Sequence, residues 1–134
     1  MKTLTLLEEF YIIVPDNWEL VDDKEIIAIY DSYNGLGALQ FSFYQIPNQN
    51  KVSLTNELED FLFDKYENMK VIIVDNNAYF DIEDEEGIYW RYWLQEVFQK
   101  LIFISYNCEK SNRGKEDEVV NAIIKSLKSR MPII

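Results

Sequence analysis

The sequence contains no histidine, and this absence excludes several kinds of chemistry at once. Histidine is missing from all 134 residues, while the other residue types used in catalysis are present. It is the side chain most often used for proton transfer near neutral pH, and it is the commonest nitrogen ligand for zinc, copper and haem. Mechanisms of the Ser-His-Asp and Cys-His kinds are therefore excluded.

Cysteine is almost as scarce, because Cys108 is the single thiol of the chain. One cysteine cannot form an internal disulfide or a thiolate metal cluster, so nothing in the sequence ties the fold to an oxidising compartment. The charge of the adjacent Glu109 would raise the pKa of this thiol and oppose its reactivity. We interpret Cys108 as a small, unreactive residue rather than a nucleophile.

Long apolar runs are also missing. Leu4, Leu6 and Leu7 form a broken run that stops at Glu8 and Glu9, which is too short for the hydrophobic region of a signal peptide. No later stretch approaches the length of a membrane span. We therefore expect an unprocessed cytoplasmic protein with no membrane association.

Basic side chains are outnumbered, with 13 Lys and Arg against 24 Asp and Glu, and the formal net charge is −11. The imbalance is uneven: residues 1–109 hold 7 basic and 21 acidic side chains, net −14, whereas residues 110–134 hold 6 and 3, net +3. Such a charge repels phosphate backbones and anionic membranes, and it attracts basic protein surfaces. We expect a protein partner with a basic surface and no nucleic-acid partner.

Glycine and proline are few, at 4 and 3 residues, while 48% of the chain is hydrophobic and 15% aromatic. The composition is that of an ordered protein, and the absence of repeats or linkers indicates a single domain over residues 1–134. Gly35 and Gly37 form a Gly-x-Gly pair followed by strand residues, whereas a phosphate-binding loop requires a helix start. We interpret this pair as a hairpin turn that needs positive φ angles.

Hydrophobic periodicity predicts an α+β fold. Three strands, a helix, four strands and a second helix indicate a mostly antiparallel sheet of about six to seven strands, with two main helices packed on it. The strands are expected at residues 10–14, 25–30, 38–46, 70–74, 78–82, 88–97 and 100–107, and the helices at residues 53–68 and 116–129.

The order of these elements resembles that of a known superfamily. Pro15 followed by Trp18, then the segment 34–40, the meander with residues 87–91, and the strand 103–107 before a closing helix are similar to the PsbP-like superfamily. This superfamily includes the Mog nuclear-import factors and bacterial DcrB-like proteins, and the resemblance spans roughly residues 8–130. It implies an α/β/α sandwich and an accessory or adaptor role. No GTPase-binding or manganese-binding motif carries over to this sequence, so the resemblance assigns no site.

The aromatic segment 88–98 is the most distinctive local feature. Strand alternation places Trp90, Tyr92 and Leu94 on one face and Tyr89, Arg91 and Trp93 on the other. One interpretation buries both sets beneath helices and pairs Arg91 with a carboxylate. The other treats one face as a partner-binding surface, since Tyr, Trp and Arg are enriched in interface hot spots. The predicted partner-binding residues are Tyr89, Arg91, Trp93, Asp84, Glu85 and Glu86.

Acidic side chains supply the enzymatic alternative. Glycoside hydrolysis needs two carboxyls that flank the scissile bond; the candidates by density are Asp22, Asp23, Asp84, Glu85 and Glu86. Carboxylates adjacent along a chain do not by themselves face each other across a cleft, which favours solvated loop charges. The run 81–87 also lacks the spacing and central glycine of an EF-hand loop, so we expect no metal site and no cofactor.

These observations favour a non-catalytic adaptor or inhibitor that binds another protein. A bacterial toxin-neutralising immunity protein with an acidic surface is the most concrete form of this hypothesis. A chaperone for a secreted effector is an alternative, and a carboxylate-only hydrolase or small-molecule-binding protein is another. A homodimer in which the aromatic strand pairs with its own copy is a further alternative.

Overall fold

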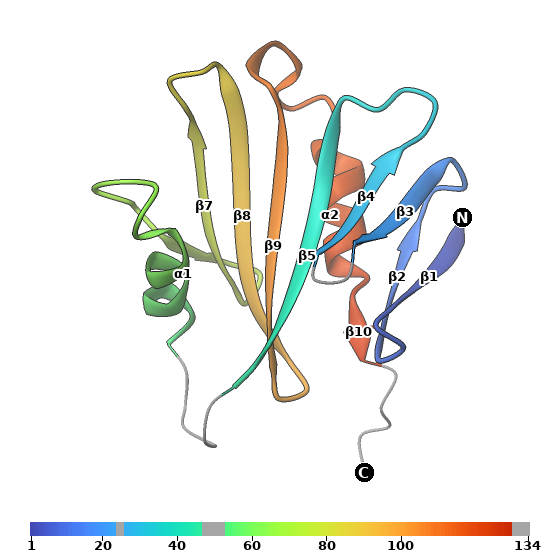
Figure 1. Cartoon of the computed structure of the whole chain (residues 1–134), viewed down its shortest axis with the longest axis horizontal. Helices are drawn as coiled ribbons and strands as arrows, with labels where there is room; N and C mark the ends of the chain where they lie inside the picture. Colours follow the sequence, from blue (N-terminus) through green and yellow to red (C-terminus); the bar gives the residue numbers. More distant parts are fainter. Residues whose placement is uncertain (24–25, 47–52, 130–134) are drawn as a thin grey trace.

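The computed structural model describes residues 1–23, 26–46 and 53–129, and two sheets dominate it (Figure 1). Over the described residues, a seven-stranded antiparallel sheet has the order β3-β4-β5-β9-β8-β7-β6, and a three-stranded sheet has the order β1-β2-β10. The elements are β1 (Lys2–Leu6), β2 (Phe10–Val14), β3 (Trp18–Asp23), β4 (Ile26–Asp31), β5 (Gly37–Gln45), α1 (Leu54–Leu62), β6 (Ile72–Val74), β7 (Asn77–Glu83), β8 (Ile88–Val97), β9 (Lys100–Glu109), the 3-10 turn η1 (Lys110–Asn112), α2 (Asp117–Lys125) and β10 (Lys128–Ser129).

Both faces of the large sheet are covered over its centre, as the α/β/α sandwich implied by the resemblance requires. On one face, Tyr92 and Leu94 of β8 pack with Leu58 of α1. On the other face, Trp93 of β8 and Ile104 of β9 belong to the core that α2 and the three-stranded sheet close. In Figure 1, α2 lies behind β5, between β9 and β4 in this view, and α1 lies at the β7 side. The α+β prediction is confirmed, with β9 at the centre of the large sheet.

Both helices follow the predicted apolar spacing but end earlier than expected. The Ser53 side chain accepts a hydrogen bond from the Asn56 N–H, which fixes the start of α1. After Leu62 the chain turns: the N–H groups of Lys65 and Tyr66 both donate to the Leu62 carbonyl, and the Tyr66 ring packs against Tyr92. In the described part of the chain, neither helix has the length and apolar character needed to cross a membrane.

The second helix ends at Lys125 rather than at residue 129 because the chain joins the small sheet. Ser126 Oγ accepts a hydrogen bond from the Ile13 N–H at 2.8 Å. Beyond it, Lys128 and Ser129 form β10 and pair with Tyr11 and Phe10 of β2. A contact between residues more than 110 positions apart therefore decides where α2 stops.

The prediction of three strands before the first helix is wrong, since five are present in the described residues. The missed strands are β1 and β3. β1 is a mixed segment that pairs with β2, and β3 carries Glu19, Asp22 and Asp23, residue types that are rare in strands. The strand predicted at residues 10–14 is confirmed as β2, but it lies in the small sheet. Residue 25, the predicted start of another strand, lies outside the described residues.

Gly35 and Gly37 do not have positive φ angles, so that part of the prediction is also wrong; the positive-φ glycines are Gly87 and Gly114. Close approach explains Gly37 instead. A Cβ atom there would overlap the Asn107 carbonyl oxygen and would lie 2.6 Å from Tyr106 Oη. The β5–β9 pairing therefore requires a residue without a side chain at this position.

We expect Gly37→Ala to lower the free energy of unfolding by about 1–3 kcal/mol, because the added methyl group overpacks the β5–β9 contact. Gly114→Asn is the control: no atom lies within 4 Å of the added Cβ, and Asn tolerates a positive φ. Urea denaturation followed by circular dichroism measures both variants. Equal stability of the two variants would contradict the overpacking.

Candidate functional site

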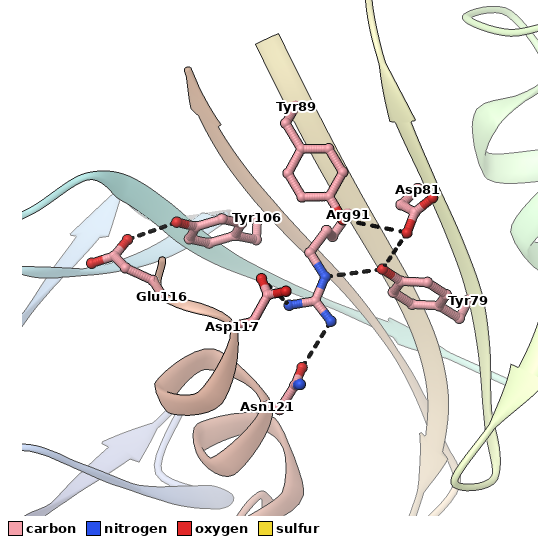
Figure 2. Close-up of polar contacts among 8 residues, drawn as sticks. All are labelled: Tyr79, Asp81, Tyr89, Arg91, Tyr106, Glu116, Asp117 and Asn121. Carbon is pink, nitrogen blue, oxygen red and sulfur yellow. Dashed lines mark hydrogen bonds and ion pairs between the residues drawn. The ribbon is translucent and has the colours of Figure 1, made fainter. Parts of the chain in front are cut away.

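Arg91 is the centre of a polar network between the sheet and α2 (Figure 2). The side chain extends from β8, where the residue is 7% exposed. Its Nε donates to Tyr79 Oη at 2.9 Å, Nη1 donates to Asp117 Oδ1 at 3.2 Å, and Nη2 donates to Asn121 Oδ1 at 2.8 Å. The guanidinium carbon also lies 4.5 Å from the centroid of a Trp93 ring. Arg91 thus links β7 and β8 to the first turns of α2.

Asp81 forms the second part of this network. Its Oδ2 accepts hydrogen bonds from Tyr79 Oη at 2.8 Å and Tyr89 Oη at 3.3 Å (Figure 2). Burial raises the pKa of Tyr79 and the pKa of Tyr89, so both phenols stay protonated and can donate at neutral pH. Asp81 is therefore connected to Arg91 through the phenol of Tyr79, whereas Asp117 contacts the guanidinium directly.

The structure buries three of the predicted partner-binding residues. Tyr89 is 3% exposed, Arg91 7% and Trp93 4%. Of the two interpretations of segment 88–98, this is the one that buries both faces of the strand and pairs Arg91 with a carboxylate. The carboxylate is that of Asp117. The partner-binding role of these three residues stays a prediction, and their side chains offer little surface for it.

A cavity of about 610 Å³ lies beside the network, between strands β6–β8 and α2. Val74, Trp93 and Ile124 give it apolar walls, while Arg91 and Lys125 contribute cationic groups. Within residues 1–23, 26–46 and 53–129, no three His, Cys, Asp or Glu side chains gather as ligands for a metal ion.

The three predicted acidic residues at the β7–β8 turn have different roles. Asp84 Oδ1 accepts the Glu86 N–H at 2.9 Å and the Ile88 N–H at 3.0 Å, and Oδ2 accepts Trp90 Nε1 at 3.0 Å. These hydrogen bonds, led by that from Ile88, lower the pKa of Asp84. Asp84 therefore fixes the turn, while Glu85 and Glu86 are exposed to solvent.

The carboxylates considered for hydrolysis do not converge. Asp22 and Asp23 lie on β3, opposite Ile27 and Ile26, and Asp84 follows β7. Four strands separate β3 from β7 in the sheet. At roughly 4.8 Å per strand spacing, these groups are too far apart to flank one glycosidic bond.

The loop between β4 and β5 presents a residue that the sequence interpretation missed. Asp31 Oδ1 accepts hydrogen bonds from the Tyr33 N–H at 2.9 Å, the Asn34 N–H at 3.0 Å and Asn17 Nδ2 at 2.7 Å. The backbone bonds lower the pKa of Asp31, so the loop keeps them at neutral pH and loses them as the pH falls through the lowered pKa. Tyr33 is 81% exposed on this fixed loop. In the sequence, the signal that could have identified Tyr33 is a large aromatic residue within a segment of turn-forming residues.

This loop borders an open depression of about 640 Å³, lined by Tyr33, Leu36, Ile88 and Glu109 among others. The loops at residues 31–36, 83–87 and 109–115 lie together at the upper end of the sheet in Figure 1, and we call them the loop end. The Lys110 N–H donates to the Gly87 carbonyl at 3.0 Å and joins two of them. The loop end holds six carboxylates (Asp31, Glu83, Asp84, Glu85, Glu86, Glu109) and three cations (Lys110, Arg113, Lys115), net −3.

A buried pair lies beneath this surface. Tyr106 Oη donates to Glu116 Oε1 at 2.7 Å, and Glu116 is 7% exposed. Burial raises the pKa of Tyr106, and the Glu116 carboxylate raises it further, so the phenol remains the donor. Burial also raises the pKa of the neighbouring Cys108, which is 4% exposed. Desolvation is thus the main cause of the raised thiol pKa, rather than the adjacent Glu109.

We expect Arg91→Ala to lower the free energy of unfolding by about 2–3 kcal/mol, because it removes three hydrogen bonds from a buried network. Arg113→Ala is the matched control, since the Arg113 and Glu83 side chains that form its ion pair are 49% and 41% exposed. Loss of that exposed pair should cost less than about 1 kcal/mol. Urea denaturation measures both, and similar values would show that Arg91 does not hold β8 to α2.

We expect Cys108 to resist thiol reagents in the native state at pH 8, because its sulfur is buried and its pKa is raised. The measurement is the absorbance released by Ellman's reagent with and without guanidinium chloride. Full reaction only after unfolding is the expected result. Rapid reaction of the native protein would contradict the burial of Cys108.

Comparison with known proteins gives structural matches only. Neither protein-family models nor curated protein sequences match the chain. Cyanobacterial PsbP from Synechocystis sp. PCC 6803 is similar in structure, with a TM-score of 0.65 and 11% identity over 96% of this chain and 91% of that one. The Ran-binding protein Mog1p of Saccharomyces cerevisiae gives a TM-score of 0.63 and 8% identity over 94% and 93%.

A third similar structure is that of a protein from Bacteroides thetaiotaomicron VPI-5482, with a TM-score of 0.61 and 12% identity over 91% of this chain. The match spans only 45% of that longer protein. At these identities the comparisons establish the fold and no site. The chain has the PsbP-like fold that the order of its predicted elements implied.

Proposed function

We propose that the protein is a non-catalytic adaptor that binds another protein through its loop end. The observation that carries this proposal is Tyr33, which is 81% exposed on a loop held by three hydrogen bonds to Asp31. Tyrosine is enriched among interface hot spots, and an anchor on a fixed loop loses little conformational entropy when it binds. Leu36, 37% exposed on the same loop, adds apolar area beside it.

Charge defines the kind of partner. The loop end is net −3 and the whole chain −11, so a basic protein surface would be attracted over a range set by ionic strength. Glu85 and Glu86 remain available for this role, because Asp84 is engaged in holding their turn. Their contribution is expected mainly in the association rate, since they lie exposed at a rim.

The comparisons support a binding role at the level of the fold. One of the similar structures is that of a Ran-binding protein, whose sequence is 8% identical to this chain. In that protein the same fold serves protein binding. The carboxylates weighed for hydrolysis are separated across the sheet or engaged in a turn. Together these points favour protein binding over turnover.

The most concrete form of the proposal is a toxin-neutralising immunity protein acting in the cytoplasm. Toxins that act on nucleic acid are often basic, and an anionic inhibitor associates with them quickly. A chaperone for a secreted effector is the alternative form, in which apolar contacts dominate. The two forms differ in salt dependence: high salt slows association in the first and leaves the complex of the second intact.

The test begins with affinity capture from the native cell and identification of the bound protein, followed by binding kinetics with the purified pair. We expect Tyr33→Ala to weaken Kd at least about tenfold. Glu85→Lys with Glu86→Lys should slow association severalfold at low salt, and the difference should vanish at high salt. Phe63→Ala is the control, because Phe63 is 75% exposed after α1, away from the loop end.

A partner that binds Tyr33→Ala as tightly as the wild type, or one with an acidic contact surface, would refute docking at the loop end. Retention of the complex in high salt, with Tyr33→Ala still defective, would favour the chaperone form over the immunity form.

A further inference from the structure

The two edges of the seven-stranded sheet differ in how they are protected. β3, at one edge, carries Glu19, Asp22 and Asp23. β6, at the other edge, consists of Ile72, Ile73 and Val74, which are 45%, 56% and 39% exposed. Edge strands are commonly protected by charged residues, because their free backbone groups are templates for pairing with another chain. β6 has no such charge.

The turn after β6 determines which backbone groups are free. Asp75 and Asn76 have φ angles of 49° and 67°, as in a two-residue hairpin turn, and Val74 pairs with Asn77 across it. The residues that flank such a turn exchange hydrogen bonds, so the next pair, Ile73 with Ala78, is a non-hydrogen-bonded one. The N–H and C=O groups of Ile73 therefore point away from β7. Among the described residues, no strand pairs with this side of β6.

We propose that β6 pairs antiparallel with β6 of a second copy of the chain, about a two-fold axis at Ile73. The strand is complementary to itself in this arrangement: Ile73 meets Ile73 of the other copy, and Ile72 meets Val74 twice. Lys70 precedes the strand and Asp75 follows it. In this register Lys70 lies opposite Asn76 of the other copy, one position from its Asp75, so each end of the pair places a cation near a carboxylate. A two-fold interface of this kind is closed and joins two seven-stranded sheets into one.

Size and charge set the expected strength of this dimer. A three-residue strand buries much less than the roughly 800 Å² per partner of a standard interface, so association is weak and depends on concentration. Each copy carries −11, so their mutual repulsion opposes pairing and added salt screens it. Salt is therefore expected to strengthen dimerisation, whereas it is expected to slow the association of a basic partner with the loop end.

The proposal uses no residue of the loop end and is independent of the proposed function. Sedimentation velocity of the whole chain tests it, from about 10 µM to about 1 mM, at low and high salt. We expect the wild type to shift towards a dimer as concentration and salt rise, and Ile73→Lys to remain monomeric throughout. Val21→Lys is the matched control: Val21 is 48% exposed on β3, and the change in net charge is the same.

A second measurement covers the case in which Ile73→Lys fails to fold. Paired antiparallel strands place directly opposed Cα atoms about 5.5 Å apart, within the range of a disulfide. Ile73→Cys should therefore form a covalent dimer under mild oxidation, whereas Val21→Cys should form much less.

A wild type that stays monomeric at the highest concentration overturns the proposal. Dimerisation unchanged in Ile73→Lys, or crosslinking as efficient through Val21→Cys, also overturns it. An isolated extended peptide that binds at β6 while the wild type remains monomeric would replace the second copy with a partner segment.

Discussion

Both faces of β8 are buried, and this burial determines how the two helices and the polar network around Arg91 are arranged. Tyr92 and Leu94 enter the core under α1, while Tyr89 and Trp93 enter the core closed by α2. Arg91 lies on the second face, so its charge requires partners within the protein. Asp117 and Asn121 supply them from α2, and Tyr79 supplies another from β7. The network thus fixes α2 against the sheet. The aromatic residues around it are buried in the core and contribute to the stability of the fold.

The acidic side chains of the chain divide into those that shape turns and those that remain exposed. Asp31 and Asp84 each accept hydrogen bonds from backbone N–H groups of the loop that follows, and their lowered pKa values keep them ionised. These two carboxylates hold the loops that present Tyr33, Glu85 and Glu86. The proposed adaptor role would benefit from this arrangement, because anchors on rigid loops bind with less loss of entropy.

The loop end and the β6 edge of the large sheet differ in chemistry. The proposed basic partner would bind the acidic loop end, and salt would slow its association. The proposed second copy would bind the uncharged β6 edge, and salt would favour its association. Both can operate in one molecule, because β6 and the loop end share no residue. Oligomeric state and partner binding can therefore be measured separately.

The amino-acid sequence predicted the α+β class and the apolar faces of both helices, because periodicity and turn residues encode local structure. Its resemblance to the PsbP-like superfamily implied the fold that the structural comparisons show. One of the two interpretations of segment 88–98 paired Arg91 with a carboxylate, as the structure shows with Asp117. Long-range contacts were needed to show that β1 and β3 are strands and that α2 ends where Ser126 meets β2. They also showed that Gly37 allows the close approach of β9 and has no positive φ. The structure also showed that Asp84 holds a turn through hydrogen bonds, whereas Glu85 and Glu86 do not, and that Tyr33 and Ile73 are exposed to solvent. These features depend on which distant segments meet, and a pattern along the chain does not carry that information.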